Sequence, residues 1–320
     1  MFPETLKAWV GIQKLPRHAV DVFSFLLGSI LAWYHTGIFH WGIFCTGLLA
    51  AFFIANGIYL TNEYQDYESD KLNTERIGGR GGMGLTTTGG TQILVRGSLK
   101  RNHVLIVGMI FFLLAVPLGL VIQFVYKTGP WTIPLGALGI FLAYSYSNPP
   151  VKASYRGLGE LFTMLGYGAL MFTAYYIQAG FSWLPLVVGL PFFVLPPGKI
   201  LRNVPDAEAD AASGKNSLVV KFGKERMIKV SAALLIATIL LFIPPLVIAL
   251  TPFTLPRLLF AAINVLPIVI LAQSACALIQ GKWETREGFV YACKKAFVAR
   301  MLGPLTLSVT FLLIALVEHL

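Results

Sequence analysis

Nine apolar runs, separated by polar segments, limit what this chain can fold into more than any other feature. Each run has roughly 16–22 residues, about the length that an α-helix needs to cross a ~30 Å hydrocarbon core. Only 12% of the residues are charged and the mean hydropathy is +0.71, whereas soluble domains are about one-quarter charged. The sequence therefore predicts an all-α fold, a polytopic membrane bundle of nine transmembrane helices at residues 19–34, 41–60, 104–125, 131–147, 158–177, 183–200, 232–250, 258–279 and 302–317.

The basic residues fall on one side of this predicted topology. With the N-terminus in the cytoplasm, all but two of the 25 Lys and Arg residues are cytoplasmic, and the exceptions are Lys127 and Arg257. Cytoplasmic loops of membrane proteins carry such an excess of basic residues. The asymmetry supports the span count and accounts for much of the net charge of +10 without nucleic acid. This charge asymmetry predicts that the protein is integral to the inner (cytoplasmic) membrane, so its partner is the lipid bilayer.

Most loop residues also lie on the cytoplasmic side. The loops there are long, chiefly 62–101, 148–156, 202–229 and 281–300, whereas the outer loops are short. Functional residues concentrate on loops, so we expect the active site to face the cytoplasm. We interpret residues 1–320 as a single integral-membrane domain. The motif loops 62–101 and 202–229 are expected to form a cap over the site.

Two acidic clusters follow the second and sixth apolar runs. They consist of Asn62, Asp66 and Asp70 and of Asn203, Asp206 and Asp210. Residues three or four apart share one face of a helix, and like charges on one face repel each other. Such stacks make physical sense when a cation lies between them. Carboxylates without His or Cys select a hard ion, Mg²⁺ or Ca²⁺. The sequence therefore predicts a catalytic metal site at Asp66, Asp70, Asp206 and Asp210.

Amide and basic side chains near these clusters are suited to a diphosphate. Mg²⁺ commonly binds through a few carboxylates together with substrate phosphate oxygens. Lys and Arg form charge-assisted hydrogen bonds with phosphate. The predicted diphosphate-binding residues are Asn62, Lys152, Arg156, Arg202 and Asn203.

These features resemble the UbiA superfamily of intramembrane prenyltransferases. The two acidic clusters look like its two aspartate-rich motifs, N-x-x-x-D-x-x-x-D and D-x-x-x-D, although Glu63 stands where many relatives have Asp. Residues 144–152, Tyr-Ser-Tyr-Ser-Asn-Pro-Pro-Val-Lys, resemble the tyrosine-rich end of the family's fourth helix. Residues 155–160, Tyr-Arg-Gly-Leu-Gly-Glu, resemble the start of helix five in the MenA-like branch, which prenylates 1,4-dihydroxy-2-naphthoate.

The resemblance implies a helical bundle around a central cavity, where the two motifs and Mg²⁺ bind an isoprenyl diphosphate donor. The donor would ionise, and its allylic carbocation would attack an aromatic small-molecule acceptor in menaquinone or other quinone biosynthesis. Tyr144, Tyr146 and Tyr155 are candidates to contact the acceptor or the carbocation, because aromatic faces stabilise cations. For the glycine-rich residues 78–84 there are two hypotheses, a cap over the diphosphate with Arg80 reaching in and a plain mobile loop.

Other functions fit parts of the same pattern. A terpene cyclase on this scaffold would ionise the same diphosphate. The same carboxylates would also serve transfer of the isoprenyl group to a different acceptor, such as 4-hydroxybenzoate, chlorophyllide, haem or a glycerol-phosphate lipid. A lipid-phosphate transporter is disfavoured, because alternating access calls for polar groups at mid-membrane and the middle of these runs is almost wholly apolar.

Overall fold

A computed structural model describes residues 4–72 and 92–319. The glycine-rich segment 78–84, with Arg80, lies outside the described residues. Every regular element in the described part is a helix, which confirms the all-α class. The main helices are α1 (Glu4–Ile12), α2 (Leu15–Thr36), α3 (Trp41–Gln65), α4 (Tyr67–Leu72), α6 (Arg101–Leu120), α7 (Thr132–Ser145), α8 (Gly159–Ala179), α9 (Leu184–Val188), α10 (Pro197–Asn203), α11 (Ala207–Ala212), α12 (Leu218–Phe222), α13 (Lys224–Leu240), α14 (Ile243–Ala249), α15 (Leu255–Ala262), α16 (Val265–Ile279) and α17 (Arg286–His319).

Six helical segments of the described chain are long and apolar enough to cross a bilayer. They are Arg17–Thr36, Trp41–Gln65, Arg101–Val125, Lys224–Ala249, Leu255–Ile279 and Arg286–His319. Each overlaps one of the predicted apolar runs. Helix α7 is a shorter apolar helix, and α8 has 21 residues. The structure therefore shows a polytopic helical bundle with six candidate spans, and the full count of nine stays a prediction.

The apolar run at residues 183–200 is not one continuous helix. It forms α9, a 3₁₀ turn at Leu190–Phe192 and α10. Proline lacks the backbone N–H and clashes with the carbonyl group of the preceding turn, so Pro191, Pro196 and Pro197 interrupt the helix. The break leaves α10 as a separate short helix that leads directly into the second acidic cluster.

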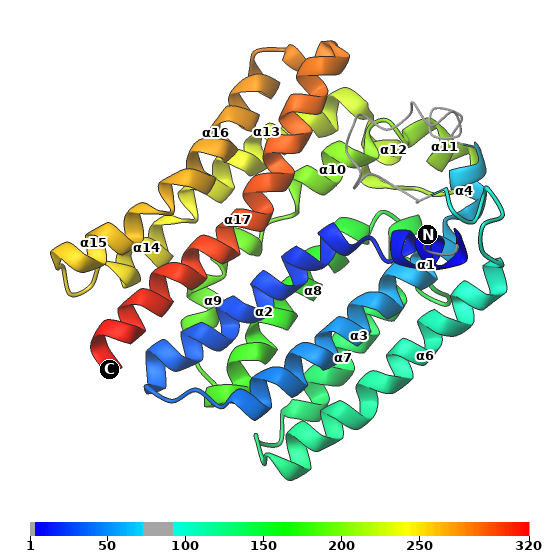
Figure 1. Cartoon of the computed structure of the whole chain (residues 1–320). Coiled ribbons are helices and arrows are strands. Elements are labelled where there is room, and N and C mark those ends of the chain that lie inside the picture. Colours follow the sequence, from blue (N-terminus) through cyan, green and yellow to red (C-terminus); the bar gives the residue numbers. More distant parts are fainter. Residues whose placement is uncertain (1–3, 73–91, 320) are drawn as a thin grey trace.

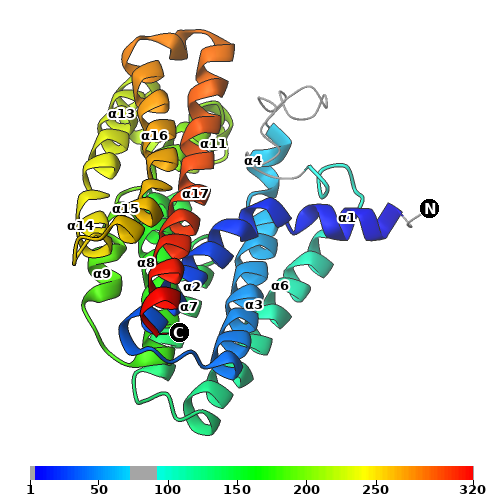
Figure 2. The same cartoon turned by 60° about the vertical axis from the view of Figure 1, so that its left-hand side comes forward.

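The long helices form two groups around α2. One group holds α3, α6, α7 and α8, and the other holds α13, α16 and α17 (Figures 1 and 2). Helix α2 packs against α3 and α8 of the first group and against α17 of the second. The largest apolar core includes Leu31 of α2, Tyr175 of α8, Leu235 of α13 and Phe311 of α17. Helix α2 therefore joins the two halves of the bundle.

Glycine allows the contact between α2 and α8 to be close. A Cβ atom added to Gly28 would lie 2.1 Å from the backbone oxygen of Met171 and 2.9 Å from the Cβ of Ala174. Small residues at such contacts let helix backbones approach each other, which is how helices commonly associate in membranes. The closeness fixes α2 against α8, and both helices contribute side chains to the cavity described below.

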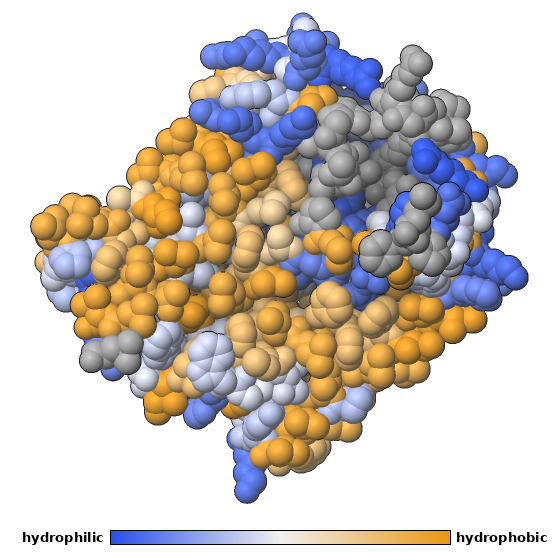
Figure 3. Space-filling model, viewed as in Figure 1, coloured by the Kyte–Doolittle hydropathy of each residue, from blue (hydrophilic) through white to orange (hydrophobic). Residues whose placement is uncertain are grey.

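The polar short helices gather at one end of the bundle. Figure 2 shows α4 and α11 at this end, with α1 lying crosswise to α3 and α6. Helices α4 and α11 pack directly against each other. Figure 3 shows hydrophilic residues concentrated around this end and hydrophobic residues covering the helices below it. The surface thus has the division expected of a protein with an apolar membrane-embedded band and a polar end.

Candidate active site

A cavity of about 450 Å³ opens among the helices and contains the predicted acidic residues at its polar end. Helices α2, α3, α6, α7, α8, α10 and α17 all contribute to its wall. The charged and amide side chains along it are Lys14, Arg17, Asp21, Asn62, Asp66, Asp70, Lys199, Arg202, Asn203, Asp206, Asp210, Lys215 and Arg300. The rest of the wall is mostly apolar and rich in Gly and Ala. The cavity therefore joins a highly charged chamber to an apolar one.

The first acidic motif lies where α3 ends. Asn62 belongs to the last turn of α3, Asp66 caps the helix and Asp70 belongs to α4. The backbone N–H of Asp66 donates to the carbonyl of Asn62, and that of Asp70 donates to the carbonyl of Asp66, both at 2.8 Å. The Asn62 amide also donates to Oδ2 of Asp66 at 2.8 Å. Although the helix is interrupted, all three side chains still line the cavity.

The second motif repeats this arrangement after α10. Asn203 ends α10, Asp206 precedes the first turn of α11 and Asp210 lies within α11. The N–H of Asp210 donates to the carbonyl of Asp206 at 2.8 Å. The Asn203 amide donates to Glu160 Oε1 of α8 at 2.8 Å. Each motif is therefore a helix end followed by a second short helix, rather than the single helical face that the spacing predicts.

A lysine connects the two motifs across the cavity. The Nζ of Lys215 lies 3.2 Å from Oδ1 of Asp66 and 3.5 Å from Oδ1 of Asp210. The hydroxyl of Ser69 donates to the same Asp210 oxygen at 2.9 Å. The cation expected between the two acidic clusters is thus supplied, in the protein alone, by an ammonium group.

Lys215 and burial shift the pKa values of Asp66 and Asp210 in opposite directions. Burial raises the pKa of Asp66, but the charges of Lys215 and Lys14 and the hydrogen bonds from Lys215 and Tyr155 outweigh burial, so the net pKa lies below its ordinary value. Burial dominates at Asp210 and raises its pKa, because Lys215 offsets burial only in part. Burial would lower the pKa of Lys215, but the two carboxylates raise it well above its usual range. The ammonium group therefore stays protonated between them.

The charged chamber is also lined by two lysines that the sequence analysis did not name as site residues, Lys14 and Lys199. Lys14 forms a buried ion pair with Glu63, the residue that replaces the family's usual Asp. Lys199 contacts the Tyr146 hydroxyl and donates to Thr163 Oγ1 at 3.1 Å. Lys199 lies inside an apolar run, and an ionisable residue in such a run is a functional signal that could have identified it.

Arg202 is also placed on the cavity wall, as predicted. Burial, together with the neighbouring charges of Arg17 and Arg300, lowers the pKa of Arg202 to about 10. It stays charged near neutral pH, and the surplus of positive charge around it favours an anionic ligand.

The structure does not bring every predicted residue to the cavity. Tyr146 lines it, whereas Tyr144, Lys152, Tyr155 and Arg156 are not among its lining residues. Lys152 lies over the ring of Tyr155 at 5.0 Å. The Tyr155 hydroxyl donates to the Gln65 carbonyl at 2.6 Å and lies 3.1 Å from Oδ1 of Asp66. Tyr155 therefore holds the end of α3 and the Asp66 carboxylate by hydrogen bonds, without lining the cavity itself.

The other two residues have contacts of their own. Tyr144 packs edge-on against Phe112. The backbone carbonyl of Arg156 accepts a hydrogen bond from Lys221 Nζ at 2.7 Å. Tyr144 belongs to α7 and Arg156 directly follows a 3₁₀ helix at Ala153–Tyr155, and neither side chain lines the cavity.

The donor set of the chamber fits a hard divalent cation. Asp66, Asp70, Asp206 and Asp210 all line it, and carboxylate oxygens are the protein ligands that Mg²⁺ prefers. Among the described residues, no three acidic, His or Cys side chains already converge closely enough to hold a metal ion alone. This agrees with a site in which substrate phosphate oxygens and water complete the coordination, as is usual for Mg²⁺.

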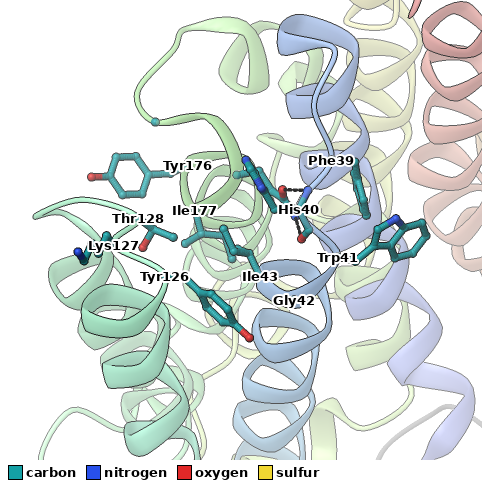
Figure 4. Close-up of a pocket in the computed structure, with 12 residues that line it drawn as sticks. Phe39, His40, Trp41, Gly42, Ile43, Tyr126, Lys127, Thr128, Tyr176 and Ile177 are labelled. Carbon is teal, nitrogen blue, oxygen red and sulfur yellow. Dashed lines mark hydrogen bonds between the residues drawn. The ribbon is translucent and has the colours of Figure 1, made fainter. Parts of the chain in front are cut away.

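A second pocket, of about 560 Å³, lies at the opposite end of the bundle (Figure 4). Figure 4 shows Lys127 and Thr128 on one side of it and His40 and Trp41 on the other. The backbone N–H of His40 donates to Gln178 Oε1 at 3.0 Å. None of the described residues that line it is acidic, so its lining differs in kind from that of the cavity above.

Comparisons with known proteins agree with this geometry. The 2-carboxy-1,4-naphthoquinone phytyltransferase of Synechocystis sp. is 32% identical over 228 residues, which cover 69% of this chain and 68% of the relative. The 1,4-dihydroxy-2-naphthoate octaprenyltransferase of Bacillus subtilis is 24% identical over 212 residues, covering 65% of this chain and 63% of the relative.

Solved structures show the same fold. A UbiA homologue from Archaeoglobus fulgidus, bound to DMAPP and Mg²⁺, superposes with a TM-score of 0.63 at 19% identity, covering 95% of this chain and 98% of that one. Residues 22–300 match the UbiA prenyltransferase family. Because this match covers most of the sequence, the chain belongs to the UbiA prenyltransferase family.

Proposed function

We propose that this enzyme transfers an isoprenyl group from an isoprenyl diphosphate to 1,4-dihydroxy-2-naphthoate, in a Mg²⁺-dependent step of menaquinone or related quinone biosynthesis. The observation that carries the proposal is the convergence of Asp66 and Asp210 on one cation at the mouth of an apolar cavity. The names of the relatives from Synechocystis and Bacillus subtilis support a naphthoate acceptor. The UbiA homologue from Archaeoglobus fulgidus, whose solved structures are bound to DMAPP and Mg²⁺ and to GPP and Mg²⁺, supports Mg²⁺ and a prenyl diphosphate.

The charged chamber suits the diphosphate end of the donor. Asp66, Asp70, Asp206 and Asp210 would hold Mg²⁺, with Asn62 and Asn203 fixing the helix ends that carry them. Bound Mg²⁺ would neutralise the charge that develops on the leaving diphosphate. Arg202, Lys199 and Lys215 lie on the same wall, where they would hold the remaining oxygens through charge-assisted hydrogen bonds.

The reaction breaks the bond between C1 of the isoprenyl group and the diphosphate oxygen, which leaves with the electron pair. A bond then forms between C1 and a ring carbon of the acceptor, and that carbon gives up its proton to a carboxylate of the chamber, so that the ring becomes aromatic again. Tyr146 lines the cavity, and its ring already lies 4.1 Å from the Lys199 ammonium. We propose that this ring also faces the allylic cation, because aromatic faces stabilise positive charge. The apolar wall keeps water away from the cation.

The apolar chamber suits the isoprenyl tail. Its apolar lining residues on α3 extend from Gly47 to Ile58, about 17 Å along a helix with a rise of 1.5 Å per residue. Four glycines of the wall, Gly119, Gly136, Gly139 and Gly166, have no atom within 4 Å of an added Cβ. Their missing side chains leave room for a chain of several isoprene units.

We also propose the topology that the charge asymmetry predicts. Nine transmembrane helices with a cytoplasmic N-terminus would place α4, α11 and the acidic motifs on the cytoplasmic side of the inner membrane. The segments 62–101 and 202–229 would then form a cap over the chamber within a single domain of residues 1–320. A cysteine-accessibility experiment with membrane-impermeant maleimide on intact cells tests this. Labelling of a cysteine introduced at Lys127 but not at Glu208 is expected, and the reverse pattern would contradict it.

The proposed reaction is tested with purified protein in lipid nanodiscs. Radiolabelled geranylgeranyl diphosphate is supplied with Mg²⁺ or EDTA, with and without 1,4-dihydroxy-2-naphthoate, and the lipid products are separated. A prenylated product that needs both Mg²⁺ and the acceptor supports the proposal. Release of diphosphate with a hydrocarbon or alcohol product, independent of acceptor, would identify a cyclase and reject it. Consumption of no donor would reject both enzymatic functions.

A further inference from the structure

Below the acidic motifs, the cavity wall carries a second group of polar side chains that the diphosphate chemistry does not use. Asp21 of α2, Tyr59 of α3, Tyr167 of α8 and Arg300 of α17 all line the cavity. Tyr59 and Asn62 are both on α3, one turn apart, so this group follows the charged chamber toward the apolar one. Ionisable residues surrounded by apolar helices are costly, and they mark functional positions.

Among the residues that the structure describes, no oxygen atom partners the guanidinium group of Arg300. Its side chain lies 4.6 Å above the ring of Tyr167. Within residues 4–72 and 92–319 it donates no hydrogen bond and forms no ion pair within 4.0 Å. A guanidinium group has five N–H donors, and burying a charge without a partner is unfavourable. These donors therefore face the cavity, ready for an anion.

Asp21 provides the opposite charge on the facing helix. Its Oδ2 accepts a hydrogen bond from the Tyr59 hydroxyl at 2.8 Å, and its side chain is 16% exposed. Asp21 and Arg300 act on each other electrostatically, yet no ion pair joins them in the described part of the chain. Asp21 of α2 and Arg300 of α17 therefore line the cavity from two helices that pack against each other, with more than an ion-pair distance between their charged groups in the described part of the chain.

A ligand that carries both an acid and a neighbouring hydroxyl would satisfy both side chains at once, because both line the same cavity. A carboxylate accepts two parallel hydrogen bonds from a guanidinium fork. A ring hydroxyl donates to a carboxylate such as that of Asp21. Arg17 and Arg202 add further positive charge close to Arg300, so a ligand with a net negative charge is favoured over a neutral one.

We propose that Arg300 and Asp21 form the acceptor subsite, which selects an aromatic acid with a hydroxyl ortho to its carboxylate. Arg300 binds the carboxylate, and Asp21, oriented by Tyr59, accepts the hydrogen bond of the hydroxyl. The ring then lies between the motif carboxylates and the apolar chamber, where it meets C1 of the donor. This inference rests on the proposed function, because it names the residues that choose the acceptor.

The first test replaces Arg300 and measures both substrates separately. Arg300→Met is expected to raise the KM for 1,4-dihydroxy-2-naphthoate at least about tenfold, because a charge-assisted two-pronged contact is lost. The KM for geranylgeranyl diphosphate should stay within about twofold, because the diphosphate is held by the motif side chains instead. Arg300→Lys keeps the charge but loses the two-pronged guanidinium contact, so its KM for the naphthoate should lie between those of wild type and Arg300→Met. Arg286→Met is the matched control, since Arg286 is exposed on the same helix.

The second test changes the acceptor instead of the protein. 1,4-Dihydroxynaphthalene lacks the carboxylate, so its KM should be the same for wild type and Arg300→Met. Binding of tritiated 1,4-dihydroxy-2-naphthoate to nanodiscs without donor gives a readout that needs no turnover, and it should weaken in Arg300→Met and in Asp21→Asn. An unchanged naphthoate KM, or an equal loss of donor affinity, overturns the subsite.

These experiments distinguish failure of the proposed function from failure of the acceptor subsite. If wild type prenylates no aromatic acid, the proposed function is rejected. If wild type prenylates the naphthoate and Arg300→Met does so with the same KM, only the acceptor subsite is rejected. Unchanged donor binding by Arg300→Lys and Arg300→Met shows that the fold persists, so loss of acceptor binding then supports the subsite.

Discussion

The Nζ of Lys215 lies 3.2 Å from Oδ1 of Asp66, which precedes it by 149 positions in the chain. The same ammonium group lies 3.5 Å from Oδ1 of Asp210. Two carboxylates that face each other are stable only when a cation compensates them. In the protein alone that cation is the Lys215 ammonium group. When substrate is bound, Lys215 and Mg²⁺ would compensate the two carboxylates together.

Replacement of Lys215 by Met therefore tests the exchange of one cation for another. Without Mg²⁺ the variant should have a lower Tm than wild type, because Asp66 and Asp210 are left facing each other. Added Mg²⁺ should raise the Tm of the variant more than that of wild type, because the metal replaces the missing charge. Lys221→Met, which changes an exposed lysine of the same region, should behave like wild type. An equal Mg²⁺ response in all three proteins would contradict the shared cation site.

Neutralisation of a motif carboxylate should abolish turnover and preserve the fold. Asp66→Asn and Asp206→Ala are expected to lower kcat at least about a hundredfold, since electrostatic stabilisation of a leaving group typically contributes that much or more. Glu68→Gln and Glu208→Gln are matched controls, because both side chains lie in the same motifs but are 64% and 88% exposed. Activity is followed by release of diphosphate and folding by elution in detergent. Full activity of Asp66→Asn would reject the metal site.

The pH dependence of stability should reveal the depressed pKa of Asp66. Burial opposes ionisation, but Lys215, Lys14 and two hydrogen bonds lower the pKa of Asp66 below that of the unfolded chain. Such a group stabilises the fold above its unfolded pKa, and this stability is lost as pH falls through the folded pKa. The Tm difference between wild type and Asp66→Asn should therefore shrink as pH is lowered below about 4. A difference that grows on acidification would show the opposite sign of shift.

Filling the apolar chamber should shorten the donor that the enzyme accepts. Gly136 lines the cavity on α7, and nothing lies within 4 Å of an added Cβ. Gly136→Phe is expected to lower kcat/KM for geranylgeranyl diphosphate about tenfold or more, because the end of the tail loses its space. Turnover of geranyl diphosphate should be spared, since the shorter tail ends before this position. Equal losses for both donors would place the tail elsewhere.

The close contact of α2 and α8 should make Gly28 intolerant of even one methyl group. Its added Cβ would lie 2.1 Å from the Met171 carbonyl oxygen. Gly28→Ala is expected to destabilise the protein by about 1–3 kcal/mol, the usual cost of overpacking. Gly139→Ala adds the same methyl group into open space within α7, so its Tm should stay equal to or above that of wild type. Similar melting of both variants would contradict the tight crossing.

Several elements could be predicted from sequence because their signals are local. The apolar runs became helices with nearly the expected bounds, as α3 and α6 show, since length and hydropathy alone select a helix in a bilayer. The spacing of the acidic motifs also selected residues that line one cavity in the structure. The sequence did not reveal that α3 ends before Asp66, because a four-residue repeat has the same appearance in one helix and in two.

The chain by itself determined the helical class, the membrane band and the two carboxylate motifs, because composition and spacing are properties of neighbouring residues. Only the tertiary structure decided which distant side chains meet. It placed Lys215 between Asp66 and Asp210, excluded Lys152 and Arg156 from the cavity, and set Arg300 opposite Asp21. The physical reason is that these meetings depend on how α2, α8, α10 and α17 pack. Packing is fixed by close contacts between helices, as at Gly28, and apolar periodicity along one helix does not encode its partners.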